Sequence, residues 1–148
     1  MAVQTTAGQP VEASSKTVVE QRTRAYLRGS VALQTAAVFF QAATAGLLLS
    51  TSYGETLHSV GARVMYGASM LYLLAAVLAW RPGGGSPRPI LHATGFLVLA
   101  SAQVVLGVAH VPAVHVPLGV LIFGLSLAVL VRMPAARLVR RTAGTRDR

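Results

Sequence analysis

The fold is decided by residues 89–131, which read PILHATGFLVLASAQVVLGVAHVPAVHVPLGVLIFGLSLAVLV. These 43 residues contain no Asp, Glu, Lys or Arg. A helix needs about 20 residues to cross the roughly 30 Å hydrocarbon core of a bilayer, because each residue adds about 1.5 Å. The run is therefore long enough for two membrane spans. It divides naturally at Val111–Pro117, where two prolines bracket a turn.

Two more apolar stretches come before this run. Residues 31–52 carry no charge, and residues 58–80 carry one, Arg63. Only 11% of the 148 residues are charged, whereas a soluble domain has about 25%. The chain has no Cys, which excludes a disulfide framework and a zinc–thiolate site. We predict an all-α integral membrane protein, an up-down-up-down four-helix bundle with spans near 30–52, 56–80, 90–111 and 114–132.

The basic residues indicate how the chain is oriented. Twelve of the 13 fall in the two tails and the middle loop, which a four-span chain places on one side. The positive-inside rule makes this side cytoplasmic. We therefore expect a multi-pass protein of the bacterial inner (cell) membrane with both termini cytoplasmic. Its parts would be a mostly disordered tail (1–28), a transmembrane domain (29–133) and a basic tail (134–148). The net charge of +9 then indicates contact with anionic lipids rather than with nucleic acid.

The two halves of the chain look alike. Each has a Gln inside its outgoing span, a His that opens its returning span, and a Gly within the next turn. The first half carries Gln41, His58 and Gly61, and the second carries Gln103, His115 and Gly119. This pattern predicts an internal two-helix repeat. Chance similarity in a chain rich in Ala, Leu, Val and Gly is the alternative.

His58 and His115 are the strongest candidates for a functional site. Both open a span at the outer side, and the second and fourth helices of such a bundle lie on a diagonal. Their imidazoles can then face each other across the core, an arrangement that suits the two axial ligands of one haem iron. Ionisable groups at this depth are costly and are usually functional.

The neighbours of these histidines fit the same interpretation. Gly61, Ala62 and Gly119 lie one turn further on and would leave room for a porphyrin, although small residues also serve simply to let helices pack closely. Gln41 and Gln103 would contact the cofactor or form hydrogen bonds between helices. A divalent metal site at Glu55, His110 and His115 is a further alternative.

Two segments resemble the heme A synthase family. Glu55-Thr-Leu-His58-Ser-Val-Gly-Ala-Arg63 is similar to the Glu-x-x-His motif that opens that family's second helix. Gln103-Val-Val-Leu-Gly107, followed by His115 at the start of the fourth span, is similar to its third and fourth helices. The resemblance covers residues 30–132, one four-helix half of the usual eight-helix protein. It implies haem ligation by His58 and His115. It also implies that Glu55 matches the acidic residue associated with hydroxylation of the haem methyl group.

Three functions follow as expectations. The first is an integral membrane protein that binds one haem b between its second and fourth helices, for electron transfer or haem handling near the respiratory chain. The second is a structural or accessory membrane protein without a cofactor. The third is a divergent heme A synthase-like oxidoreductase in which Glu55 is catalytic. Expected partners are membrane lipids, and either a second copy of the chain or a respiratory-chain protein.

Overall fold

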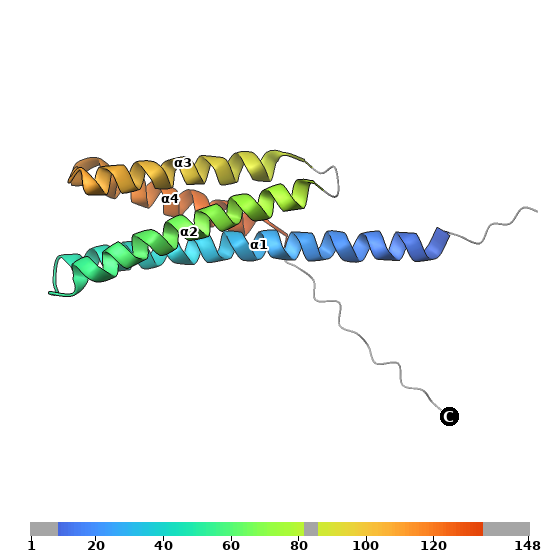
Figure 1. Cartoon of the computed structure of the whole chain (residues 1–148), viewed down its shortest axis with the longest axis horizontal. Helices are drawn as coiled ribbons and strands as arrows, with labels where there is room; N and C mark the ends of the chain where they lie inside the picture. The colour runs from blue at the N-terminus through green and yellow to red at the C-terminus, as the bar shows by residue number, and fades with distance from the viewer. Residues whose placement is uncertain (1–8, 82–85, 135–148) are drawn as a thin grey trace, which may run out of the picture.

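The computed structural model describes residues 9–81 and 86–134, and it is helical almost throughout. The helices are α1 (Gln9–Leu48), α2 (Gly54–Trp80), α3 (Arg88–Val108) and α4 (Pro112–Arg132) (Figure 1). Each of the four contains a stretch long and apolar enough to cross a membrane. The prediction of an all-α fold is confirmed, and the length and composition of the four helices support a multi-pass membrane protein.

The first helix differs most from its prediction. It begins at Gln9 rather than near residue 30, so much of the segment predicted as a disordered tail is helical. Arg24 donates a hydrogen bond to Glu20 over 2.6 Å, an i,i+4 ion pair of the kind that supports a helix. The helix also ends at Leu48 instead of residue 52. Ser50 and Thr51 donate their hydroxyl protons to the carbonyls of Gly46 and Leu47, as such residues do where a helix stops. Of the predicted C-terminal tail, residues 135–148 lie outside the described residues.

The four helices pack in a closed ring of neighbours. Helix α1 packs against α2 and α4, and α3 packs against the same two helices, whereas α1 and α3, like α2 and α4, make no close backbone approach in the described chain. Figure 1 shows the α1–α2 and α3–α4 turns at one end of the molecule, and the end of α2 and the start of α3 at the other. Helices α2 and α4 therefore face each other across the diagonal.

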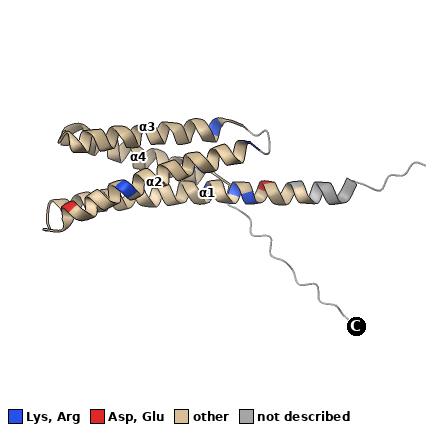
Figure 2. Ribbon diagram, viewed as in Figure 1, with Lys and Arg blue, Asp and Glu red and all other residues tan. Residues whose placement is uncertain are grey.

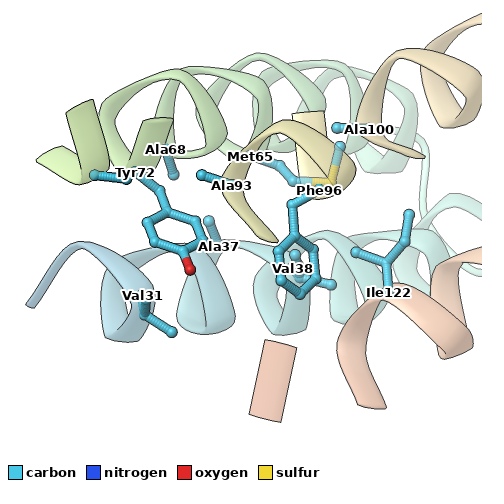
Figure 3. Close-up of a cluster of buried hydrophobic side chains, with 11 residues drawn as sticks. Val31, Ala37, Val38, Met65, Ala68, Tyr72, Ala93, Phe96, Ala100 and Ile122 are labelled. Carbon is cyan, nitrogen blue, oxygen red and sulfur yellow. The ribbon is translucent and has the colours of Figure 1, made fainter. Parts of the chain in front are cut away.

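A small apolar core lies between the helices (Figure 3). It combines a few large side chains with many alanines, which let the helices approach closely. Its buried members include Tyr72 and Ala68 of α2, Ala93, Phe96 and Ala100 of α3, Ile122 of α4, and Val31, Ala37 and Val38 of α1. The outer surface is equally apolar: Leu74, Val105 and Val120 are all more than half exposed. Lipid is the solvent that accommodates such a surface.

Polar side chains also tie the helices together inside the bundle. The hydroxyls of Thr35 on α1 and Ser126 on α4 lie 2.6 Å apart, and Ser126 is completely buried. At the end of the bundle away from the two turns, the Arg28 guanidinium donates hydrogen bonds to the carbonyls of Leu130, at 3.3 Å, and Met133. A cation at the last carbonyls of α4 complements the negative end of the helix dipole. This contact fixes α1 against the end of α4.

Candidate functional site

The structure brings His58 and His115 together. His58 lies in the first two turns of α2 and His115 in the first turn of α4, the two helices that face each other across the diagonal. Their ring centroids are 6.3 Å apart and their planes are inclined by 67°. Both side chains are half-buried. Two residues that are 57 positions apart in the sequence thus meet near the end of the bundle that carries the two short turns.

His58 is held by two side chains of α1. The amide nitrogen of Gln41 lies 3.2 Å from Nε2 of His58, and since an amide nitrogen can only donate, Nε2 accepts. The other ring nitrogen, Nδ1, then carries the proton and donates to the Thr44 hydroxyl over 3.4 Å. Thr44 in turn donates to the Gln41 carbonyl over 3.0 Å. The ring is therefore fixed as the tautomer that keeps its lone pair on Nε2.

His115 reaches the same tautomer by a different contact. Its Nδ1 donates to the backbone carbonyl of Gln103 on α3 over 3.0 Å. Nε2 of His115 carries the lone pair and makes no hydrogen bond within the described chain. The ring also lies against Gly107, where an added Cβ would come within 3.3 Å of its Cε1 atom. The imidazole of His115 thus packs against α3 at two residues that lie four positions apart, Gln103 and Gly107.

The glycines one turn beyond each histidine are covered by the predicted glutamines. A Cβ on Gly61 would collide with the amide oxygen of Gln41, and a Cβ on Gly119 would lie 2.7 Å from the amide nitrogen of Gln103. The space predicted as room for a porphyrin is thus filled by the tips of two flexible side chains. Ala62, the remaining predicted member of the site, is half-buried next to Gly61.

Both glutamines keep an amide oxygen that is buried and has no hydrogen-bond partner. Such a group costs about 1–3 kcal/mol, and it is uncommon enough in a folded protein to require an explanation. Because each amide stands over a glycine, rotation of its side chain would expose the backbone beneath and allow its nitrogen or oxygen to find a new partner.

The separation of the two rings is the size needed for a metal held between two imidazoles, although Nε2 of His58 now faces the amide of Gln41. With metal–nitrogen bonds of about 2 Å on each side, the two ligating nitrogens stand about 4 Å apart and the ring centroids about 6 Å apart. The observed separation of 6.3 Å is of this size. Histidines that bind metals donate their other ring N–H to a carbonyl or similar acceptor. Both histidines meet this requirement through Nδ1.

The remaining histidines and Glu55 lie apart from the pair. His92 is exposed in the second turn of α3, at the opposite end of the bundle. Glu55 is exposed and lines an outer hollow of about 270 Å³ that also includes Arg63. No group of three metal-binding side chains forms among the described residues, so the structure does not assemble the alternative site of Glu55, His110 and His115.

His110 has a structural role that its residue type did not suggest. It is the one described residue other than glycine with a positive φ, at 55°. The His110 amide donates to the Gly107 carbonyl over 3.2 Å, and the Val111 amide donates to the Leu106 carbonyl over 3.1 Å. These two bonds form the Schellman motif that ends many helices, with His110 in the place usually taken by glycine.

Sequence reasoning missed Thr44 and the Thr35–Ser126 pair. Thr44 is 1% exposed and contacts His58, and its position three residues after Gln41 places it on the same helical face, which is the signal that could have found it. Gln34, one heptad before Gln41, is also 1% exposed, and both its amide atoms lack a partner in the described chain.

The chain matches no family model, no curated protein and no solved structure. The similarity of its two short motifs to heme A synthases is therefore a resemblance and does not assign the chain to that family.

Proposed function

We propose that this protein binds one haem b in the membrane, with His58 and His115 as its axial ligands. The observation that carries the proposal is the state of the two imidazoles. They come from facing helices, their centroids are separated by 6.3 Å, and each has its Nδ1 proton engaged so that the lone pair lies on Nε2.

The protein's own residues would prepare this site in three ways. Thr44 and the Gln103 carbonyl orient the two rings and raise the basicity of their ligating nitrogens. Gln41 occupies Nε2 of His58 and would have to swing away for ligation. Gly61 and Gly119 present backbone without side chains once the two glutamine tips rotate. Haem bound there would supply a one-electron couple in a low-dielectric interior.

The proposed topology is an up-down-up-down bundle of two related hairpins in the bacterial inner membrane, with both termini cytoplasmic. The charges support this orientation. Among the described residues, most Lys and Arg residues gather at the end where α2 stops and α3 begins (Figure 2), whereas Glu55 and Arg63 belong to the first three turns of α2. The histidine pair then lies towards the outer face. The repeat is supported by the way each glutamine covers the glycine that follows the histidine of its own half.

Electron transfer or haem handling near the respiratory chain is the role we propose for the bound haem. A divergent heme A synthase-like activity through Glu55 is the second possibility, favoured by the Glu-x-x-His motif. Glu55 lines the outer hollow together with Arg63, apart from the histidine pair. This position favours a protein that carries electrons or haem over one in which Glu55 acts on the haem. The two are distinguished by Glu55→Gln: a carrier would keep its haem chemically unchanged with or without this substitution, whereas a synthase would convert the haem side chain only with Glu55.

The test is an absorption spectrum of the full chain, purified in detergent from haem-replete cells. We expect a Soret band from a six-coordinate, bis-imidazole haem, and its loss or shift to a lower-coordinate form in His58→Ala and in His115→Ala. The matched control is His92→Ala, an exposed histidine at the other end of the bundle, which should leave the spectrum unchanged. A colourless protein that also gives no His-dependent spectrum on addition of haem would refute the proposal in favour of a cofactor-free accessory protein.

A further inference from the structure

A polar hollow lies on the outside of the bundle, separate from the histidine pair. It has a volume of about 270 Å³ and is formed by the first three turns of α2, with Glu55, Thr56, Ser59, Val60 and Arg63 as its lining residues. All five are exposed. The hollow therefore opens away from the core, on a helix that is long and apolar enough to cross the membrane.

Arg63 is the unusual member of this hollow. It lies nine residues into α2, about 13 Å along the helix axis at about 1.5 Å per residue. This depth is within the hydrocarbon region if the helix begins near the membrane surface. An ionisable side chain at such a depth is costly and normally faces a partner. Within the described chain, neither Arg63 nor Glu55 forms an ion pair or a side-chain hydrogen bond.

Any partner of Arg63 lies outside the bundle that the described residues form. Arg63 is half a helical turn away from buried residues such as Gly54 and Tyr72, so it points away from the other helices. Its neighbours Val60 and Val64 are 43% and 47% exposed, which places apolar surface beside the guanidinium. The outer side of α2 thus presents one positive and one negative group, neither of which has a partner among the described residues.

The order of these groups along α2 is informative. Glu55 is in the first turn, Thr56 and Ser59 follow, and Arg63 is deepest, about 12 Å beyond Glu55 along the axis. Side chains on a helix tilt towards its N-terminus, and a long Arg side chain snorkels towards the membrane surface. The guanidinium therefore approaches the level of Ser59, with a carboxylate above it and apolar side chains beside and below it.

We propose that this hollow binds the headgroup of a phospholipid that carries a primary ammonium group. From water inwards, such a lipid presents its ammonium, then its phosphate, then its acyl chains. The ammonium meets Glu55, the phosphate meets the guanidinium of Arg63 and the hydroxyls of Thr56 and Ser59, and the acyl chains lie along Val60 and Val64. Arginine suits phosphate because its planar donors form two parallel hydrogen bonds.

Two other lipid classes match the hollow less well. An anionic phosphatidylglycerol has no ammonium group to pair with Glu55, so the repulsion between the carboxylate and the lipid phosphate is not offset. A phosphatidylcholine carries a positive charge but has no N–H to donate to the carboxylate. Selectivity for the ammonium headgroup would thus come from Glu55, and affinity for any phospholipid would come from Arg63.

The experiment measures lipid retention on the full chain by native mass spectrometry, with phosphatidylethanolamine, phosphatidylglycerol and phosphatidylcholine added separately to the detergent-solubilised protein. We expect phosphatidylethanolamine to be retained with an apparent Kd about fivefold lower than that of phosphatidylcholine, which has the same net charge, the ratio given by one charged contact at the membrane surface. Glu55→Gln should remove this preference, and Arg63→Gln should weaken retention of all three lipids by about fivefold. Arg88→Gln, an exposed arginine at the other end of the bundle, is the control: it should weaken retention of the anionic phosphatidylglycerol alone and leave the other two lipids unchanged.

Three outcomes would overturn the proposal. The first is equal retention of phosphatidylethanolamine and phosphatidylcholine, and the second is retention that Arg63→Gln leaves unchanged. The third is a dimer that is lost in Glu55→Arg and in Arg63→Glu but restored when both substitutions are combined, because this would show that Arg63 pairs with Glu55 of a second copy. None of these measurements depends on haem, so the lipid site and the haem site can fail independently.

Discussion

The turn between α1 and α2 offers a direct test of the packing at the end of the bundle near the histidine pair. Gly54, the first residue of α2, is buried against the last turn of α1. A Cβ at this position would lie 2.5 Å from the carbonyl carbon of Leu47 and 2.6 Å from the Cα of Leu48, and it would collide with the Leu47 carbonyl oxygen. These are backbone atoms of a helix, which cannot rotate away as a side chain does. Gly54→Ala must therefore push the start of α2 away from α1.

The expected cost is that of overpacking a well-packed site, about 1–3 kcal/mol. Alanine is a better helix former than glycine by up to about 1 kcal/mol, but this gain is smallest at the first position of a helix and does not offset the collision. We expect Gly54→Ala to lower the free energy of unfolding by about 1–2 kcal/mol. Reversible unfolding in mixed micelles, titrated with a denaturing detergent and followed by circular dichroism, measures this quantity.

Gly67 provides the matched control on the same helix. A Cβ there would meet no atom within 4 Å, so only the propensity gain remains and Gly67→Ala should stabilise the protein by about 0.5–1 kcal/mol. The two substitutions make the same chemical change and should have opposite signs. Equal effects at the two positions, or a Gly54→Ala variant as stable as the wild type, would refute the close approach of α2 to the end of α1.

Two other substitutions test contacts that hold the helices and their turns. In a double-mutant cycle of Thr35→Val and Ser126→Ala, also measured by unfolding in mixed micelles, we expect a coupling of about 0.6 kcal/mol, the average for hydrogen bonds between membrane helices; a coupling of zero would contradict the 2.6 Å contact of their hydroxyls. His110→Gly should raise the unfolding free energy by about 0.5–1 kcal/mol, because glycine removes the strain of a positive φ at some cost in chain entropy. A loss of stability in this variant would show that the His110 side chain makes a contact that outweighs its backbone strain.

The sequence predicted the four apolar helices because the signal is strong and local. Long charge-free runs between clusters of arginine leave few other solutions, and the predicted ends of α2 and α4 lie within two residues of those observed. Helix α1 was predicted less well, since its first half is polar and has no apolar run to mark it. Its extension to Gln9 depends on helix propensity and on pairs such as Glu20 with Arg24, which are weak signals in a sequence.

The sequence predicted that His58 and His115 lie close together, but it did not predict their hydrogen bonds. The positions of His58 and His115 follow from span boundaries and from the diagonal of a four-helix arrangement. Their hydrogen-bond partners depend on helix rotation and on rotamers, which spacing does not determine. The Gln103 backbone carbonyl, which accepts the His115 proton, has no signature in the sequence at all. The prediction that glycines leave space was incomplete for the same reason, because two glutamine tips from neighbouring helices occupy it.

The two histidines of the pair are held in different ways, and the difference bears on how a ligand would bind. Nε2 of His58 accepts a hydrogen bond from Gln41, whereas Nε2 of His115 makes none within the described chain. His115 is also held by backbone and by Gly107, which move little, while His58 is held by two side chains, which move easily. His115 could therefore hold a metal centre through Nε2 as it stands, whereas His58 could do so only after Gln41 had moved away. The amide whose oxygen is already unsatisfied is the group that has to move.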